Sequence, residues 1–285
     1  MKKKKVSISQ IIIYIVLILW ALTTIYPIVW VVQNSFKAKN AIVSNSFSLP
    51  LGELFTFSNY KTAFKSMNIG SAYMHSLIIS ISVCVFVVLL AGMASYGLVR
   101  YQFKGRNFLN SLVVAGMMFP VFSTIIPVFR MEFSWGIAGN NNVWLSLLAT
   151  ILPQIAGNLS FAIVVLSGFI RGLPIELEEA AYMEGCKARQ IFTKVIMPIT
   201  KPSFATVAIF SFLWSYNDLF TQSFFLRTKQ KYTITMLLNM ISSNEGTNYG
   251  LMAAAVTLVV VPLVLVYIFL QKYIIKGMTA GAIKG

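Results

Sequence analysis

The few acidic residues of this chain are unevenly placed, and half of them share one polar stretch. Of the eight acidic residues, four lie in the segment Leu173–Pro202, between two long apolar runs: Glu176, Glu178, Glu179 and Glu184. A structured polar segment between apolar runs needs a reason. A surface on which a soluble partner docks is the first reason to consider.

The residue types needed for catalysis or metal binding are sparse. His75 is the only histidine, and the chain lacks the sequence Gly-x-x-x-x-Gly-Lys-Ser/Thr, so we expect neither a histidine-rich metal site nor ATP hydrolysis. No nucleophile with a neighbouring base stands out. Cys84 lies in an apolar run and Cys186 in the polar stretch, a placement that implies no disulfide framework. We therefore expect no enzyme and no cofactor in this chain.

The polar stretch is typical of a helix, a turn and a second helix. Pro174 suits the first position of a helix, because its missing N–H has no intrahelical partner there. Three glutamates follow in the first turns, where they meet the positive end of the helix dipole. Ala180 and Ala181 form a thin face that another backbone can approach closely, and Gly185 fits the helix stop. The second, basic helix is predicted to end before Pro198.

Two uses of this segment remain open on physical grounds. One is the docking of another protein on its exposed face. The other is a hairpin that packs on the membrane face of the same protein. The segment has few apolar residues that could anchor such self-packing, and this favours docking.

Composition predicts an all-α membrane protein. Of the residues, 57% are hydrophobic and only 11% are charged, whereas a soluble domain carries about 25% charged residues. A spanning helix needs about 20 mainly apolar residues. Six runs meet that length and are apolar all round, unlike a surface helix of a soluble protein. They are Ile11–Gln33, Met74–Val99, Phe108–Phe129, Val143–Phe169, Ser203–Phe225 and Leu251–Gln271.

The net charge of +15 follows the positive-inside rule rather than a nucleic-acid surface. With both termini inside, most basic residues fall in cytoplasmic segments, and the first apolar run is too long for a cleaved signal peptide. This topology predicts an N-terminal span and a long outer loop over residues 1–73. A five-helix core follows over 74–271, with the cytoplasmic segment 171–202 inside it, and a cytoplasmic tail covers 272–285.

The polar stretch also resembles a known family. Glu179-Ala180-Ala181, three further residues, then Gly185 and later Pro198 resemble the cytoplasmic loop of permease subunits of binding-protein-dependent ABC importers. The segments 101–106 and 117–120 look like those of carbohydrate-type permeases. The tail 277–285 is similar to the ending of the second permease of maltose-type oligosaccharide importers. The resemblance covers about residues 10–285.

The resemblance implies a type I importer permease fold in the bacterial cytoplasmic membrane. It also implies four partners besides lipid: a second, different permease, two copies of an ATPase that hold ATP and magnesium, and an extracytoplasmic sugar-binding protein. The ATPase would contact two parts of the chain, the cytoplasmic loop and the C-terminal tail. In the loop these are Glu179, Ala180, Ala181, Glu184, Gly185 and Pro198, and in the tail they are Gly281, Lys284 and Gly285.

One acid lies within an apolar run. A charge near the bilayer centre costs about 2.5–3.5 kcal/mol on insertion scales, so Asp218 is a functional candidate. Trp214, Tyr216 and Asn217 stand beside it, and sugars are bound by planar hydrogen-bond partners and aromatic faces. A structural contact with the partner permease, or a place near the outer water boundary with the aromatic residues in the interfacial belt, remains open as well.

Two other classes of protein were weighed against an importer permease. A self-contained secondary transporter or channel often shows two related halves, and this chain has no internal repeat that we recognise. An intramembrane enzyme needs paired acids, or histidines with acids, at membrane depth. Asp218 and His75 lie on different apolar runs and do not supply such a pair.

Overall fold

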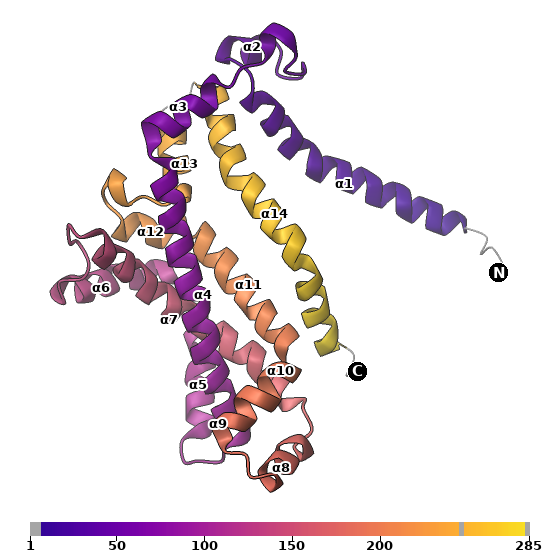
Figure 1. The fold of residues 1–285 in the computed structure, drawn as a ribbon, viewed down its shortest axis with the longest axis vertical. Helices are drawn as coiled ribbons and strands as arrows, with labels where there is room; N and C mark the ends of the chain where they lie inside the picture. The colour runs from indigo at the N-terminus through magenta and orange to yellow at the C-terminus, as the bar shows by residue number, and fades with distance from the viewer. Residues whose placement is uncertain (1–6, 245–247, 283–285) are drawn as a thin grey trace. The chain divides into compact units, whose positions relative to one another are not determined.

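The computed structural model describes residues 7–244 and 248–282, and every regular element within them is a helix. Figure 1 shows the helices in chain order. The chain forms two compact units, the first from residues 1–69 and 237–263 and the second from residues 70–236 and 264–285. The α-helices are α1 (Ile8–Ser35), α2 (Lys39–Ser44), α3 (Ser58–Met67), α4 (Ile69–Arg100), α5 (Arg106–Gly116), α6 (Val121–Ser134), α7 (Val143–Arg171), α8 (Glu176–Met183), α9 (Ala188–Ile191), α10 (Met197–Ile199), α11 (Lys201–Asn217), α12 (Leu219–Phe225), α13 (Ile234–Asn244) and α14 (Tyr249–Ala282).

Three of these helices, α1, α4 and α7, are long and apolar enough to cross a membrane by themselves. Two bent pairs raise the number to as many as five among the described residues. One is α5 with α6, bent by 104°, and the other joins residues 188–199 to α11, bent by 81°. The last apolar run lies in α14, in which the residues Tyr249–Leu265 form an apolar helical segment. The number of six spans therefore stays a prediction.

Two apolar runs that we expected to be single spans are each divided into two helices. The run Phe108–Phe129 breaks between α5 and α6, where Pro120 is the extended residue before α6. Proline fixes its own backbone and has no N–H to give a preceding turn, so a helix does not continue through it easily. The run Ser203–Phe225 breaks at Asp218, whose carboxylate caps the start of α12.

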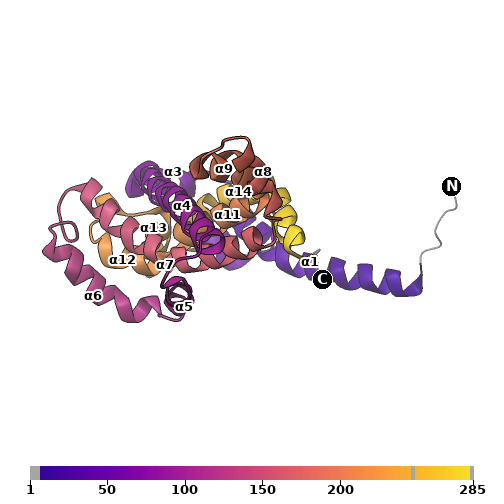
Figure 2. The same ribbon diagram turned by 90° about the horizontal axis from the view of Figure 1, so that it is seen from below.

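The core of the second unit lies between α4, α7 and α11. Ile79, Val83 and Val87 of α4 are fully buried there against residues of α7 and α11 such as Leu166. Gly92 of α4 permits a close approach to α11, because an added Cβ would lie 2.7 Å from the Phe204 ring. Figure 2 shows that α6 lies well apart from α8 and α9 in this unit.

The first unit is organised around a buried lysine beyond the end of α1. Lys37 is 0% exposed, and its Nζ donates to the carbonyl oxygens of Asn45 and Ser46 and to Ser48 Oγ, each at 3.2 Å. Burial lowers the pKa of Lys37 from its usual value of 10.5. The segment after α1 is thereby closed on itself by hydrogen bonds to one side chain.

Candidate functional site

The acidic helix of the polar stretch is α8. It begins at Glu176, two residues after Pro174, so the prediction that Pro174 is its first residue was wrong. Ile175 takes the N-terminal capping position, and the first turn contains Glu176, Glu178 and Glu179. The helix stop at Gly185 is confirmed, because its φ of +77° lies in the left-handed region that favours glycine.

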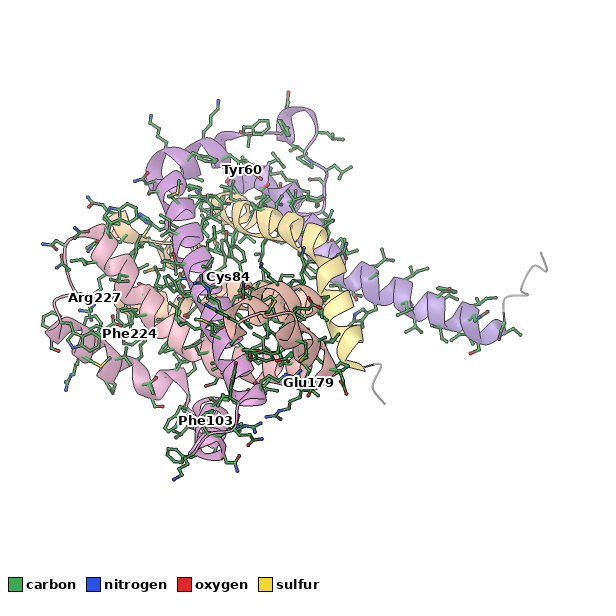
Figure 3. The ribbon with its side chains drawn as sticks, turned by 60° about the horizontal axis from the view of Figure 1, so that its bottom comes forward. Tyr60, Cys84, Phe103, Glu179, Phe224 and Arg227 are labelled. Carbon is green, nitrogen blue, oxygen red and sulfur yellow. The ribbon has the colours of Figure 1, made fainter. Side chains whose placement is uncertain are left out.

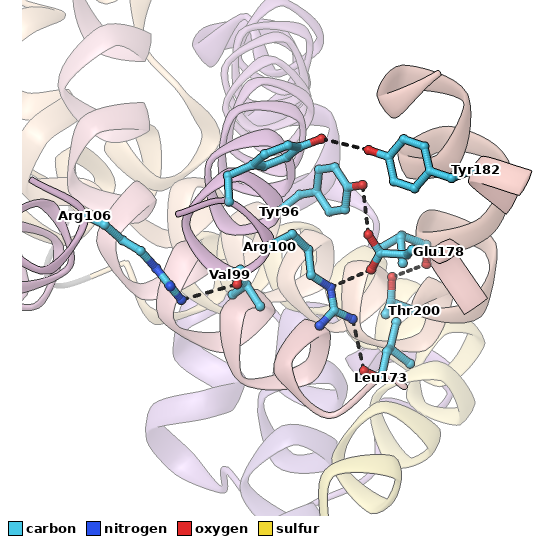
Figure 4. A network of polar contacts seen from close by, with 10 residues as sticks. Tyr96, Val99, Arg100, Arg106, Leu173, Glu178, Tyr182 and Thr200 are labelled. Atoms are coloured by element: carbon cyan, nitrogen blue, oxygen red, sulfur yellow. Dashed lines mark hydrogen bonds and ion pairs between the residues drawn. The ribbon is translucent and has the colours of Figure 1, made fainter. Parts of the chain in front are cut away.

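One glutamate of α8 points into the protein. Glu178 is 3% exposed, and its Oε1 accepts a hydrogen bond from Arg100 Nε at 2.5 Å while Oε2 accepts one from the Tyr96 hydroxyl at 3.0 Å. Arg100 also donates from Nη2 to the carbonyl oxygen of Leu173 at 3.0 Å. Figure 4 shows these bonds, which join α8 and Leu173, three residues before it, to the end of α4. They fix α8 to a long apolar helix.

An apolar cluster strengthens this attachment. Tyr96, Ile170, Ile191 and Ile196 are buried together, and Ala181 packs against them with other partly buried side chains. We expected few apolar anchors in this segment, and that expectation was wrong. Sequence reasoning missed them because isoleucines at the start and middle of the basic helix become anchors only once that helix folds back onto the ends of α4 and α7.

The opposite side of α8 carries no such cover. Glu179, Ala180, Glu184 and Gly185 are exposed, as is Met183 with 88% of its surface free. We call these five residues the α8 outer face. Figure 3 labels Glu179 on this helix. Ala181, which we predicted to share this face, is half-buried against the cluster instead.

A tyrosine pair borders the α8 outer face. The hydroxyls of Tyr101 and Tyr182 lie 3.5 Å apart, and this hydrogen bond, together with burial, raises the pKa of Tyr182. Tyr101 follows directly on Arg100, so the same end of α4 contacts α8 at two places. Both contacts hold the exposed glutamates in a fixed position relative to α4.

The basic helix after Gly185 runs further than predicted. It extends over residues 188–199 and includes Pro198, which we had placed after its end. A π turn over Phe192–Ile196 ends two residues before this proline and contains the carbonyl of Lys194, four residues before Pro198. A proline ring clashes with that carbonyl in a regular α-helix. The wider turn explains how the helix continues, and Pro198 itself is exposed.

Sequence reasoning missed Tyr96, Arg100 and Glu178 as members of the site. Arg100 counted only as a topology charge, and Glu178 only as a charge near a helix start. The two residues are 78 positions apart in the chain. The only hint in the sequence was that acidic residues are rare. A glutamate in a chain with so few acids could be expected to pair with an arginine at the end of a predicted span.

The second predicted cluster lies at the break between α11 and α12. Asp218 Oδ1 accepts from the Thr221 backbone N–H at 2.9 Å, and Oδ2 accepts from Gln154 Nε2 at 2.9 Å. Gln154 Oε1 in turn accepts a hydrogen bond from the Ser215 hydroxyl. Each oxygen of Asp218 thus accepts a hydrogen bond from a group of this chain at the break between α11 and α12. A place for Asp218 on the sugar path stays a prediction.

Two of the three predicted neighbours of Asp218 line a hollow with it, and the third is buried elsewhere. Trp214 and Asn217 line, with Asp218, an open hollow of about 570 Å³. Asn217 donates from Nδ2 to the carbonyl oxygen of Leu213 at 2.8 Å, within its own helix. Tyr216 is 4% exposed, stacks near Phe212, and does not line the hollow.

The remaining predicted residues belong to the tail. Gly281 lies in the last turns of α14, whereas Lys284 and Gly285 lie outside the described residues. Across residues 7–244 and 248–282, no group of three or more histidine, cysteine, aspartate or glutamate side chains is placed to hold a metal ion.

The chain is similar in sequence to proteins of one transport family. The family model of binding-protein-dependent transport system inner membrane components matches residues 87–280. The diacetylchitobiose uptake system permease protein NgcG of Streptomyces coelicolor is 33% identical over 94% of this chain and 87% of its own length. The galactooligosaccharides transport system permease protein GanQ of Bacillus subtilis is 31% identical, over 95% and 94%. The trehalose transport system permease protein SugB of Mycobacterium tuberculosis is 31% identical, over 91% and 92%.

Two solved structures share the fold. A chain of a bacterial ABC transporter that imports the acidic polysaccharide alginate matches with a TM-score of 0.79 and 22% identity, over 95% of this chain and 99% of its own. A chain of an alginate transporter in complex with a periplasmic protein bound to an alginate pentasaccharide matches with a TM-score of 0.64 and 17% identity, over 90% and 91%. The all-helical fold is that of type I importer permeases.

Proposed function

The chain belongs to the binding-protein-dependent transport system inner membrane components, and we propose that it carries an oligosaccharide across the bacterial cytoplasmic membrane. It is a transport subunit of an ABC importer and not itself an enzyme. Its relatives are permeases for diacetylchitobiose, galactooligosaccharides and trehalose. These cargoes differ in their sugar units but are all carbohydrates, which supports the class of substrate rather than one member of it.

The single observation that carries the mechanism is the two-sided packing of α8. Its inner side is fixed to α4 by Glu178, Arg100 and Tyr96, while Glu179 and Gly185 are exposed on the outer side. A helix that passes movement from a motor to a membrane helix needs a firm attachment on one side and a free contact surface on the other. We propose that the α8 outer face rests on an ATPase subunit.

The proposed assembly has three kinds of partner. A second, different permease completes the path, two copies of an ATPase hold ATP and magnesium, and a soluble protein delivers the sugar from outside. The pentasaccharide-bound periplasmic protein in the second solved structure supports the last of these by analogy of fold. Within the coupling contact we include Ala181 and Pro198 beside the outer face, and Gly281, Lys284 and Gly285 of the tail.

The test begins with the complete assembly. The chain is expressed with the products of its neighbouring genes, purified and reconstituted in liposomes that contain ATP. Uptake of radiolabelled diacetylchitobiose, galactotriose and trehalose (the sugar panel) is then measured. We expect uptake of at least one panel sugar that requires ATP and the soluble protein. Uptake by this chain alone, driven by an ion gradient, would instead favour a secondary transporter.

A charge reversal tests the coupling contact separately. Glu179→Lys changes only an exposed side chain of α8, and Glu53→Lys is the matched control in the exposed outer segment. We expect Glu179→Lys to lower co-purification of the ATPase and ATP-dependent uptake, while the two permeases stay together. Equal uptake by the Glu179→Lys and Glu53→Lys variants would refute the proposed contact.

A further inference from the structure

We propose that a second hollow of this chain, beside α6, binds one ring of a neutral sugar as it crosses, with Glu132 as the hydrogen-bond acceptor. This inference rests on the proposed function. The hollow measures about 470 Å³, which lies within the usual range of roughly 300–1,000 Å³ for small-molecule sites. It is formed within the second unit by residues of α6, α7, α11 and α12.

Glu132 is the unusual residue of this hollow. It is 1% exposed, and none of the described residues donates a hydrogen bond to its Oε2. Burying a carboxylate without a partner is costly, because the oxygens give up their hydrogen bonds to water. A ligand hydroxyl donating to Glu132 would remove that cost, so the hollow is complete only when it is occupied.

The contrast with Asp218 separates two roles. Asp218 has a partner in this chain for each oxygen, Gln154 for one and the Thr221 N–H for the other. Glu132 lines a hollow and has an oxygen free to accept. Of these two acids, therefore, Glu132 is the one placed to meet a substrate.

Aromatic side chains give the hollow its second property. Trp135 and Trp214 both line it, and 57% and 42% of their surfaces are exposed. Trp214 and Val121 also line the hollow beside Asp218, so the two spaces adjoin along α6 and α11. Pockets of this kind combine apolar and aromatic walls with a few placed polar groups.

The combination selects a class of ligand. A pyranose ring has an apolar face that suits an indole and hydroxyls that donate to a carboxylate. A second carboxylate, that of an acidic sugar, would place like charges side by side in the same buried hollow, which is costly. The hollow therefore fits a neutral sugar, in keeping with the cargoes of the named relatives and unlike alginate.

The test uses the reconstituted assembly and the panel sugar that the unmodified assembly takes up fastest. Glu132→Gln keeps the shape of the side chain and removes its charge, and Glu53→Gln is the control. Hydrogen bonds to charged groups are worth roughly ten- to a hundredfold in binding. We expect Glu132→Gln to raise the KM for uptake by about that factor, with co-purification of the subunits unchanged.

A second variant tests the space itself. A Cβ on Gly157 would lie 3.6 Å from Trp214 Cη2, so Gly157→Leu fills the hollow from α7. Gly168→Leu is the control on the same helix, where an added Cβ meets no atom within 4 Å. We expect Gly157→Leu to impair uptake as Glu132→Gln does, and it decides the matter if the Glu132 variant fails to assemble.

The outcomes keep this inference separate from the proposed function. If the unmodified assembly takes up no panel sugar, the proposed function fails before any variant is compared. If it does take one up, and the Glu132→Gln and Gly157→Leu variants match their controls within twofold, the hollow is not on the sugar path. Loss of uptake with an unchanged KM would likewise overturn a binding role for Glu132.

Discussion

Removing the carboxylate of Glu178 should release α8 from the membrane helix while leaving the rest of the fold in place. The change is Glu178→Ala, and the matched control is Glu179→Ala at the next position. The side chains of Arg100 and Glu178 are 11% and 4% exposed. Because the pair is buried, Arg100 keeps only its bond to the Leu173 carbonyl in the variant and is left with an unpaired charge.

The magnitude follows from that burial. Breaking a buried ion pair by removing one partner costs about 3–5 kcal/mol, whereas an exposed pair is worth about 0–1 kcal/mol. The Tyr96 hydroxyl also loses its acceptor in the variant. Since each 1.4 kcal/mol is a factor of ten, the opening of α8 should become at least about a hundredfold more frequent.

Hydrogen exchange measures this opening directly. The backbone N–H groups of residues 179–186 should exchange at least about a hundredfold faster in Glu178→Ala, and no more than a few-fold faster in Glu179→Ala. Core N–H groups of α7 report on the global fold and should not change in either variant. Equal exchange of α8 in the two variants would refute the assignment of Glu178 as its anchor.

A double variant separates the pair from its surroundings. Replacing both partners of a buried ion pair by apolar residues is often neutral or stabilising. Arg100→Met with Glu178→Met should therefore recover much of the protection that Glu178→Ala loses. Protection that stays as low in the double variant as in Glu178→Ala would mean that the apolar cluster cannot hold α8 without the charges.

Three further predictions concern stability. Lys37→Met should lower the free energy of unfolding by about 1–3 kcal/mol, since three acceptors lose their donor, whereas Lys39→Met at an exposed position should not. The pKa of Lys37 is lower in the folded chain, so as pH approaches 10.5 the unfolded chain binds more protons than the folded one. The free energy of unfolding should therefore rise with pH in that range, and Lys37→Met should not show this rise. Gly92→Ala should cost about 1–3 kcal/mol against the aromatic ring on α11, while Gly97→Ala, in open space, should be neutral or stabilising in thermal unfolding. Asp218→Ala should cost about 0.5–2 kcal/mol through the lost cap of α12, measured by denaturant unfolding.

The sequence predicted those features that depend on local chemistry. The all-helical class followed from apolar runs of bilayer length, and the stop at Gly185 followed from a residue that accepts positive φ. The exposed positions of Glu179 and Glu184 agree with the docking alternative. These inferences needed only the composition of a short segment.

What depends on distant residues was not predictable in the same way. The partner of Glu178 lies 78 positions away, and the self-packing of the basic helix depends on where α4 and α7 end. The break at Asp218 was not predicted, because a lone acid in an apolar run says nothing of Gln154 on another helix. Glu132 was overlooked because no neighbouring residue in the sequence indicates that it would be buried without a partner.

Glu178 is buried and its neighbour Glu179 is exposed, and this limits how the length of the connection between Arg171 and Glu176 can vary. Successive residues of an α-helix are turned by about 100°, from 3.6 residues per turn. Deleting one residue between Arg171 and Glu176 would oblige α8 either to rotate by that angle, which exchanges the buried and the exposed carboxylate, or to shift along its axis away from Arg100. Surface loops usually tolerate insertions and deletions, but this connection should vary by substitution and hardly ever by length.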